Sequence, residues 1–303
     1  MTSPVSPRMK VWIDGRVVDA SEARVPVTDH GLLYGDGVFE GIRIYNREVF
    51  RLADHLRRFE SGARAIGLDL PLDLDGIGKI VLETARAFGE DEAYLRLVVT
   101  RGEGGLGVDP TTCHDPRLFC IAAKIDIFTP ERVEAGIDMV TVSVRRPALD
   151  ALDPRVKSLN YLNSALAKRE ARLRGADEGL ILNAAGNVAE ASVANVFVVR
   201  DGALLSPPPT DGSLDGITRD SVMKIAAELG IPAREETLSR VDLLRADEVF
   251  LTGSGARIVP VATLDGQPVG SGDVAPGARP VTRQVLDAFP GFTKRNGTPF
   301  TRD

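Results

Sequence analysis

Residues 155–174, RVKSLNYLNSALAKREARLR, carry a lysine whose position suits covalent chemistry. Lys157 stands just ahead of leucines that recur at helical spacing, at Leu159, Leu162, Leu166 and Leu173. This spacing predicts an amphipathic helix that buries its leucine face. A lysine at the mouth of a buried helix can be held by packed neighbours and partly desolvated, which makes its amine available as a nucleophile or Schiff-base former. Most lysines are exposed, so a solvated lysine in a first helical turn is the competing interpretation.

Three other sites could bind charged parts of a cofactor or substrate. Gly216, Ile217 and Thr218 begin a predicted helix, where backbone N–H groups, the helix dipole and Thr218 as a cap favour a phosphate. Arg58, in HLRRF, is a second candidate for a phosphate. Glu190 lies among small and apolar residues, where an unpaired carboxylate is costly to bury, so it is a candidate partner for a protonated ring nitrogen. The alternative for Gly216 to Thr218 is an ordinary capped helix. The alternative for Arg58 is a solvated arginine, and for Glu190 it is the solvent face of a strand.

Residues 102–107, GEGGLG, follow a predicted strand and match the dinucleotide-binding fingerprint in form. The next residues, VDPTTCHDP, cannot continue as the phosphate-binding helix that this fingerprint requires. We therefore reject NAD binding. We expect either a mobile glycine-rich loop beside a site or a plain surface loop.

The composition favours small-molecule chemistry. The chain has 303 residues, of which 43% are hydrophobic, and a net charge of -6, whereas nucleic acids and anionic membranes require a concentrated basic surface. Cys113 and Cys120 form no disulfide framework, and three histidines form no zinc-type cluster, so we expect no metal. No signal peptide and no apolar run of membrane-spanning length is evident. These features predict a soluble cytoplasmic protein with no nucleic-acid or membrane partner.

The hydrophobic periodicity predicts an α/β (α+β) fold in two domains. Hairpins are expected to turn at Asp14-Gly15 and Asn46, before helices over 52–68 and 74–89 that each end at a glycine. The elements that follow are predicted as strands over 93–101, 117–125 and 136–146, antiparallel strands over 178–208, a helix over 216–230, strands near 234 and over 247–253, a hairpin at Asp265-Gly266 and a last helix over 278–289.

The predicted domain boundaries follow from the same pattern. Residues 1–125 form a small N-terminal α/β domain, and 126–134, which include Pro130, form a linker. Residues 135–303 form a larger domain that carries Lys157, with mostly antiparallel strands and flanking helices. The polar tail from Gly291 is expected to be loose.

Six blocks in order resemble the class IV, or fold type IV, pyridoxal-phosphate aminotransferases. These blocks are YGDGVFEGIR from residue 34, HLRRF from 55, KSLNYL from 157, AEASVANVF from 189, GITRD from 216 and DEVFLTGS from 247. They span roughly nine-tenths of the chain, and the ordered set is far more specific than any single block. FEGIR, with Phe39, Gly41 and Arg43, and the strand residues Tyr94 and Arg96 are most similar to branched-chain amino acid aminotransferases.

The resemblance implies pyridoxal 5'-phosphate as the cofactor and a role for each matching residue. Lys157 would bond to the cofactor and then move the substrate α-proton, and Glu190 would keep the ring nitrogen protonated. The phosphate would be bound by Arg58 and by the segment Gly216-Ile217-Thr218. Tyr161 would lie near the phenolic oxygen, and Ser254 is a further cofactor-binding candidate.

The resemblance also implies how substrates are recognised. Tyr94 and the backbone at Ser254 and Gly255 would receive the α-carboxylate, and Arg96 would receive the side-chain carboxylate of glutamate. Phe39 and Gly41, with Arg43 in the same block, would form the side-chain pocket. Tyr34 and the loop Leu106-Gly107-Val108 would come from the neighbouring subunit of a homodimer or higher homo-oligomer with a shared active site.

The resemblance implies amino-group transfer between L-branched-chain amino acids (Leu, Ile, Val) and 2-oxoglutarate, as in branched-chain amino acid biosynthesis. Two alternatives share the fold: a D-amino acid or (R)-amine transaminase, and a 4-amino-4-deoxychorismate lyase. FEGIR favours the branched-chain activity, while KSLN also occurs in D-amino acid enzymes. A ligand-binding relative that has lost catalysis is poorly supported, because the lysine, glutamate and phosphate groups are all present.

Overall fold

The computed structural model describes residues 8–125, 128–270 and 273–300. They belong to two compact units that interleave along the chain. The first unit is drawn from Met1–Ile125, Val156–Asn160 and Thr293–Asp303, and the second from Asp126–Arg155 and Tyr161–Phe292. Lys157 therefore packs with the first unit. The boundaries 1–125, 126–134 and 135–303 stay a prediction.

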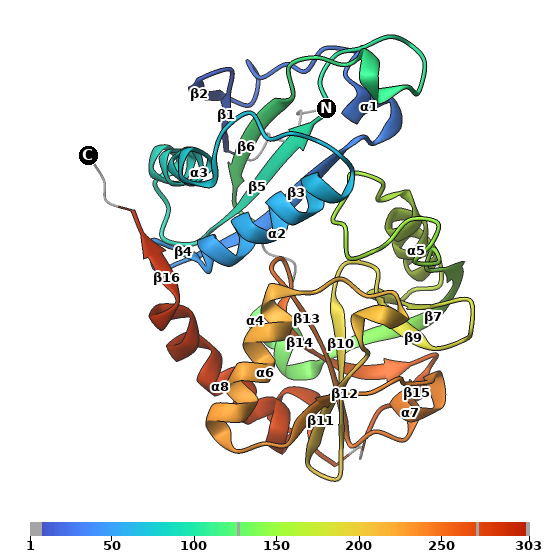
Figure 1. Cartoon of the computed structure of the whole chain (residues 1–303). Coiled ribbons are helices and arrows are strands. Elements are labelled where there is room, and N and C mark those ends of the chain that lie inside the picture. Colours follow the sequence, from blue (N-terminus) through green and yellow to red (C-terminus); the bar gives the residue numbers. More distant parts are fainter. Residues whose placement is uncertain (1–7, 126–127, 271–272, 301–303) are drawn as a thin grey trace, which may run out of the picture. The chain divides into compact units, whose positions relative to one another are not determined.

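The first unit is built on a seven-stranded antiparallel sheet with the order β16-β4-β3-β5-β6-β1-β2 (Figure 1). Both predicted hairpins are confirmed. Asp14 and Gly15 have φ of 50° and 81°, and Asn46 and Arg47 have φ of 49° and 65°, as tight two-residue turns require. The strands are β1 (Met9–Ile13), β2 (Arg16–Asp19), β3 (Gly37–Tyr45), β4 (Glu48–Phe50), β5 (Ala93–Thr100), β6 (Arg117–Ala123) and β16 (Gly297–Pro299).

Helix α2 (Leu52–Ala65) packs on β3 of this sheet, and α3 (Leu74–Phe88) packs on β1 and β6. The short helix α1 (His30–Tyr34) precedes both in the chain. The predicted glycine stop of α3 is confirmed, because Gly89 takes a left-handed φ of 75° and caps the helix. Phe59 and Phe88 are buried together with Ile42 and Leu95 in one core cluster. The segment 102–107 is a loop, followed only by the 3₁₀ turn η1 (Pro110–Thr112).

The second unit is built on a nine-stranded mixed sheet with the order β12-β11-β10-β13-β14-β7-β8-β9, in which β15 pairs with β14. Most neighbouring strands are antiparallel, and β11–β12, β14–β7 and β7–β8 are parallel. The predicted hairpin at Asp265-Gly266 is confirmed, and a tight turn at Asp201-Gly202 joins β10 to β11. The strands are β7 (Ile137–Arg145), β8 (Glu178–Leu182), β9 (Val188–Ala191), β10 (Asn195–Arg200), β11 (Ala203–Ser206), β12 (Ala233–Glu235), β13 (Glu248–Gly253), β14 (Arg257–Leu264) and β15 (Gln267–Pro268).

The helices of this part of the chain include one in the predicted linker. They are α4 (Pro130–Ala135), α5 (Leu162–Leu173), α6 (Ile217–Leu229), α7 (Arg240–Leu244) and α8 (Pro280–Arg295), with 3₁₀ turns η2 (Pro209–Asp211) and η3 (Pro276–Ala278). Thr129 caps α4 by accepting a hydrogen bond from the backbone N–H of Arg132, and Pro130 occupies the first turn, where its missing N–H does no harm. Residues 126–127 of the predicted linker lie outside the described residues.

The orientation predicted for the helix after Lys157 is wrong. Helix α5 begins only at Leu162, and its leucines face outward: Leu162 and Leu173 are 71% and 70% exposed. Ala167 and Ala171 are fully buried instead, against β7 and β8. A Cβ at Gly179 of β8 would lie 3.1 Å from the Ala167 carbonyl oxygen, so the helix approaches the sheet too closely for leucine.

The prediction of a loose tail is wrong for residues 291–300. Helix α8 continues through Pro290 to Arg295, and β16 then pairs antiparallel with β4. Phe292 and Phe300 are each 4% exposed, so two aromatic rings anchor this otherwise polar segment. Residues 301–303 lie outside the described residues.

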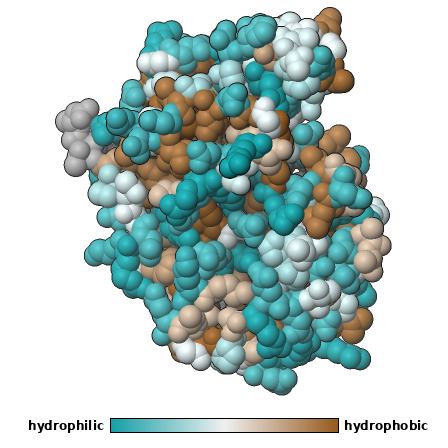
Figure 2. All heavy atoms as spheres, in the orientation of Figure 1, coloured by the Kyte–Doolittle hydropathy of each residue, from teal (hydrophilic) through white to brown (hydrophobic). Residues whose placement is uncertain are grey.

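The surface shows hydrophobic residues among polar ones (Figure 2). Within the described ranges, no helix combines the length and the apolar character needed to cross a bilayer.

Candidate functional site

Strand β3 presents different side chains on its two faces, because successive residues of a strand alternate. Phe39, Gly41 and Arg43 share one face. On the neighbouring strand β5, Arg96 pairs with Gly41 and Tyr94 pairs with Arg43. The structure therefore brings these five predicted substrate-binding residues together on one face of the sheet.

The contacts on this face join an aromatic ring, a hydroxyl and a cation. The Arg96 guanidinium lies over the Phe39 ring, 4.5 Å from its centroid, and its Nη2 donates a hydrogen bond to the Tyr94 hydroxyl at 3.1 Å. Gly41 makes room for this arrangement, because a Cβ there would overlap the Tyr94 hydroxyl. Arg43 is buried as well, at 4% exposed, and donates to the carbonyl oxygen of Ile125 at 2.8 Å.

Lys157 lies in an extended segment beside the first half of β3, where the short β4 leaves the edge open. Phe39 N–H donates to the Lys157 carbonyl oxygen at 3.0 Å, and Leu159 N–H donates to that of Gly37 at 2.9 Å. The Lys157 amine lies 4.5 Å from the centroid of the Phe39 ring. Sheet pairing, and not a helix as predicted, thus positions the lysine on the same face as Phe39.

The glycine-rich loop is tied to α1. The Tyr34 hydroxyl donates to the Leu106 carbonyl oxygen, and a ring nitrogen of His30 lies 2.8 Å from that of Gly105. The side chains at the loop tip point outward, with Leu106 and Val108 78% and 77% exposed.

The opposite face of β3 carries a buried carboxylate, Glu40, that the sequence did not mark as functional. Glu40 is fully buried, and Arg58 of α2 donates to it from both Nε and Nη2 at 2.7 Å. Nδ1 of His55, also fully buried, lies 2.7 Å from the same carboxylate. Burial raises the pKa of Glu40, but Arg58 and then His55 outweigh it and lower that pKa to about 2. A glutamate among apolar strand residues, with His and Arg three apart on the next helix, is the sequence signal for this triad.

In the second unit, Glu190 lies on β9 and is 6% exposed. It forms a buried ion pair with Arg146, and it also accepts from Asn195 Nδ2 at 3.2 Å and from the Leu214 N–H at 3.1 Å. The structure thus contradicts the solvent-face alternative.

Arg146 was missed in the sequence, where the only signal is an arginine just after a strand and before Pro147. Its Nε donates to the Gly212 carbonyl oxygen at 3.1 Å, and its Nη1 donates to Asn163 Oδ1 at 3.2 Å. Burial lowers the pKa of Arg146, and the nearby Tyr161, the residue before α5, acts in the opposite direction.

The start of α6 fits a phosphate. Gly216, and not Thr218 as predicted, is the capping residue, and it provides no side-chain cap for the first N–H groups. A Cβ at Gly216 would overlap Asn195 Oδ1, so the chain needs glycine here. Thr218 is 4% exposed in the first turn.

Ser213 Oγ and Thr252 Oγ1 are buried without a hydrogen-bond partner among the described residues. Ser254 and Gly255 form part of the turn between β13 and β14 and are partly exposed. Within the described ranges, no three His, Cys, Asp or Glu side chains are grouped so as to hold a metal ion.

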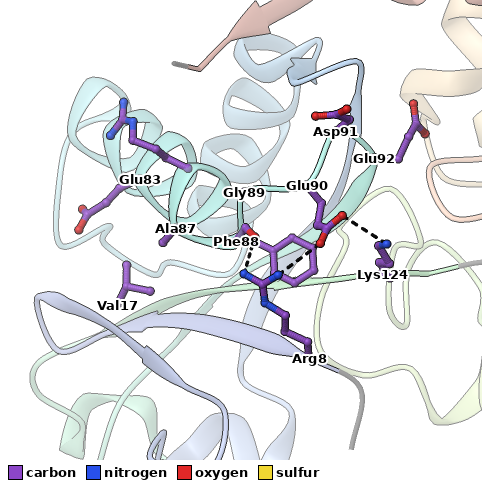
Figure 3. Close-up of a pocket in the computed structure, with 11 residues that line it drawn as sticks. Arg8, Val17, Glu83, Ala87, Phe88, Gly89, Glu90, Asp91, Glu92 and Lys124 are labelled. Atoms are coloured by element: carbon purple, nitrogen blue, oxygen red, sulfur yellow. Dashed lines mark hydrogen bonds and ion pairs between the residues drawn. The ribbon is translucent and has the colours of Figure 1, made fainter. Parts of the chain in front are cut away.

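A cavity of about 890 Å³ lies elsewhere in the first unit, at the C-terminal end of α3 (Figure 3). Arg8 and Lys124 both pair with Glu90 there, each at 3.3 Å. None of the predicted site residues lines this cavity.

With this fold and these residues, the chain belongs to the class IV aminotransferases: the family model described as amino-transferase class IV matches residues 37–264. A protein of Methanocaldococcus jannaschii, provisionally named branched-chain-amino-acid aminotransferase, is 47% identical over 93% of this chain and 95% of its own length.

Solved structures agree with this assignment. The branched-chain amino acid aminotransferase of Escherichia coli has a TM-score of 0.89 and 36% identity, covering 94% of both chains. The branched-chain amino acid aminotransferase of T.th., complexed with N-(5'-phosphopyridoxyl)-L-glutamate, has a TM-score of 0.87 and 34% identity, covering 96% of this chain and 98% of that one.

Proposed function

We propose that this protein is a branched-chain amino acid aminotransferase that uses pyridoxal 5'-phosphate. It transfers the amino group between L-leucine, L-isoleucine or L-valine and 2-oxoglutarate, giving branched-chain 2-oxo acids and L-glutamate. The observation that carries the substrate assignment is the meeting of Phe39, Tyr94 and Arg96 on one face of the first sheet. An apolar ring beside a cation suits both an aliphatic side chain and the second carboxylate of glutamate.

The residues present fit the cofactor. The uncapped start of α6, which admits only glycine at Gly216, suits the phosphate, and a buried carboxylate suits a protonated ring nitrogen. When bound, the cofactor supplies an electron sink that stabilises negative charge at the substrate α-carbon. Lys157 would hold it covalently, with Glu190 at the ring nitrogen and Tyr161 at the phenolic oxygen. Arg58, Ile217 and Thr218 would bind the phosphate, and Ser254 would complete the set.

Lys157 acts as the base and acid of the reaction. Its amine would remove the substrate α-proton and deliver a proton to the cofactor's C4′, the carbon on the other side of the shared nitrogen. The hydrogen bond from Phe39 N–H to the Lys157 carbonyl oxygen fixes the backbone of this residue, and the Phe39 ring limits where the amine can move. This support leaves the amine the small freedom that a proton transfer between two carbons on either side of one nitrogen needs.

Glu190 acts as an ionised acceptor. Three donors hold its carboxylate, the Arg146 guanidinium, the Asn195 amide and the Leu214 N–H, and each favours the charged form despite burial. An ionised carboxylate stabilises a proton on the ring nitrogen that it faces. Arg146 is therefore a positioning residue for Glu190.

For substrate recognition, we assign the α-carboxylate to Tyr94 and to the backbone N–H groups at Ser254 and Gly255. Arg96 takes the distal carboxylate of glutamate. Phe39 and Gly41 shape the aliphatic pocket, with Arg43 supporting β3 from the same face.

We further propose a homodimer or higher homo-oligomer in the cytoplasm. Tyr34 and the loop Leu106-Gly107-Val108 would contribute to the neighbouring subunit's site, since apolar side chains as exposed as Leu106 and Val108 are typical of interaction surfaces. Cell fractionation would test the compartment.

A half-reaction tests the activity. Purified holoenzyme is mixed separately with L-leucine, D-alanine and (R)-1-phenylethylamine, and the conversion of cofactor absorbance from the pyridoxal to the pyridoxamine form is followed. We expect fast conversion with L-leucine, and none in Lys157→Ala. Conversion chiefly with D-alanine or the amine would overturn the substrate assignment, and wild-type turnover by Lys157→Ala would overturn the role of the lysine.

A further inference from the structure

We infer that Glu40 is a positioning residue that fixes the plane and direction of the Arg58 guanidinium, so that Arg58 meets a phosphate in one orientation. This inference rests on the proposed role of Arg58 at the cofactor phosphate. It assigns a task to a residue on the core side of β3, away from the face that carries Phe39 and Gly41.

The geometry of the pair is bidentate. Arg58 Nε donates to Glu40 Oε1 and Arg58 Nη2 donates to Oε2, both at 2.7 Å. Two parallel bonds along one edge of a planar guanidinium leave it no freedom to rotate. Because α2 carries Arg58 and β3 carries Glu40, the pair also ties the arginine to the sheet on which Lys157 is paired.

His55 holds the carboxylate from another side. A carboxylate only accepts hydrogen bonds, so Nδ1 of His55, 2.7 Å from Glu40 Oε2, carries the hydrogen. Burial lowers the pKa of His55, Glu40 acts to raise it, and the charges of Arg58 and Lys157 lower it further. A neutral His55 therefore orients Glu40 without competing with Arg58 for its charge.

Stability alone does not account for this pair. Glu40 shares its face with Val38, Ile42 and Ile44, which are all buried and apolar, and an apolar side chain of similar volume there would often stabilise the fold as well or better. Arg58 in turn retains a 15% exposed side chain, as a group that must reach a ligand requires.

Two effects of Glu40 on a phosphate oppose each other. Its negative charge weakens the attraction of Arg58 for an anion, whereas its hydrogen bonds preorganise the guanidinium. If the preorganising hydrogen bonds matter more, Glu40→Gln should bind phosphate more weakly. If the negative charge of Glu40 matters more, Glu40→Gln should bind phosphate more tightly.

The experiment measures binding to the cofactor-free full chain by fluorescence titration with pyridoxal 5'-phosphate and with pyridoxal, which lacks the phosphate. In Glu40→Gln we expect the dissociation constant for pyridoxal 5'-phosphate to rise about tenfold, the value of one lost charge-assisted contact, and that for pyridoxal to stay unchanged. Arg58→Gln should lose at least as much, and the double variant no more than Arg58→Gln alone, because Glu40 acts through Arg58.

The matched control is Glu178→Gln, which neutralises another buried carboxylate paired with a cation, Lys168 at 2.7 Å. It should leave the ratio of the two affinities unchanged. Unchanged or tighter binding of pyridoxal 5'-phosphate by Glu40→Gln, or an equal loss for pyridoxal, would overturn the inference while leaving the proposed function standing. Full affinity in Arg58→Gln would overturn the phosphate role of Arg58 as well.

If Glu40→Gln does not fold, Arg58→Lys replaces it. Lysine keeps the positive charge but cannot make the bidentate pair. The same selective loss of the phosphate-bearing ligand is expected, and wild-type affinity in Arg58→Lys would overturn the inference.

Discussion

At the scale of single residues, two buried carboxylates of this protein are each paired with a cation. Glu190 pairs with Arg146, and Glu40 pairs with Arg58 and His55, and cations and N–H donors favour the charged form of a carboxylate. In the proposed function, the Glu190 carboxylate meets the cofactor's ring nitrogen and the Arg58 guanidinium meets its phosphate.

Replacing Arg146 by glutamine should destabilise the protein by about 3 kcal/mol, because Glu190 would remain buried without its cation. Urea denaturation of the cofactor-free full chain measures this change. The neighbouring Arg145→Gln is the control, since the Arg145 side chain is exposed and donates to the carbonyl oxygens of Val142 and Ser143. The double variant Arg146→Gln/Glu190→Gln should recover part of the loss, and no recovery would contradict the pairing.

The Glu40 triad predicts acid sensitivity. The pKa of Glu40 falls from 4.5 to about 2 on folding, so the unfolded chain binds the proton more readily than the folded chain. This difference stabilises the folded protein by about 3 kcal/mol above pH 4.5. The stabilisation is lost as the pH falls from 4.5 towards 2. The lowered pKa of His55 acts in the same direction from pH 6.5 downward. We expect the free energy of unfolding, measured in urea, to decrease as the pH is lowered below 6.5 and again as it is lowered from 4.5 towards 2.

Glu40→Gln should remove the drop between pH 4.5 and 2 that Glu40 causes and keep the drop that begins near pH 6.5. An unchanged pH profile in this variant would show that other carboxylates dominate.

At the scale of elements, β3 and α5 show how close packing selects residue types. Strand β3 places Phe39, Gly41 and Arg43 on one face and Glu40 on the other, so one strand supports both groups. Helix α5 packs its small side chains on the sheet, and the leucines that define its periodicity face outward.

This orientation of α5 predicts unequal effects of two substitutions. Ala167→Leu should lower the free energy of unfolding by about 2 kcal/mol, because the buried alanine lies against Gly179 and no room exists for a larger side chain. Leu173→Gln, at an exposed position, should change it by less than about 0.5 kcal/mol. Thermal and urea denaturation measure both, and the reverse ranking would mean that the leucine face is the buried one.

At the scale of the whole molecule, the proposed homo-oligomer with shared sites can be tested by complementation. Lys157→Ala removes the proposed catalytic amine, and Val108→Asp alters the exposed loop tip. If the loop serves the neighbouring subunit, co-expression of the two variants should give mixed dimers. Each mixed dimer then has one intact site, which combines Lys157 of one subunit with the unaltered loop of the other. About a quarter of the wild-type sites would then be intact, from random pairing into symmetric dimers.

Transamination rates per subunit measure this recovery, and sedimentation velocity reports the assembly. A rate equal to the mean of the two separate variants would contradict a loop shared between subunits.

The sequence alone determined the family, the cofactor and most of the elements. Hairpin turns at Asp14-Gly15 and Asp265-Gly266 and the glycine stop at Gly89 are local signals, because only a few residue types tolerate a positive φ. The order of the motif blocks identified Lys157, Glu190 and Arg58 as candidates together, with no knowledge of their contacts.

Only the tertiary structure decided how these residues are supported. Sheet pairing with β3, which joins residues far apart in the chain, holds Lys157, and partners distant in sequence, Arg146 for Glu190 and Glu40 for Arg58, hold the charges. The buried face of α5 and the ordered segment 291–300 were likewise settled by packing. Local periodicity records which side chains are apolar, whereas the space available between a helix and its sheet decides which of them are buried.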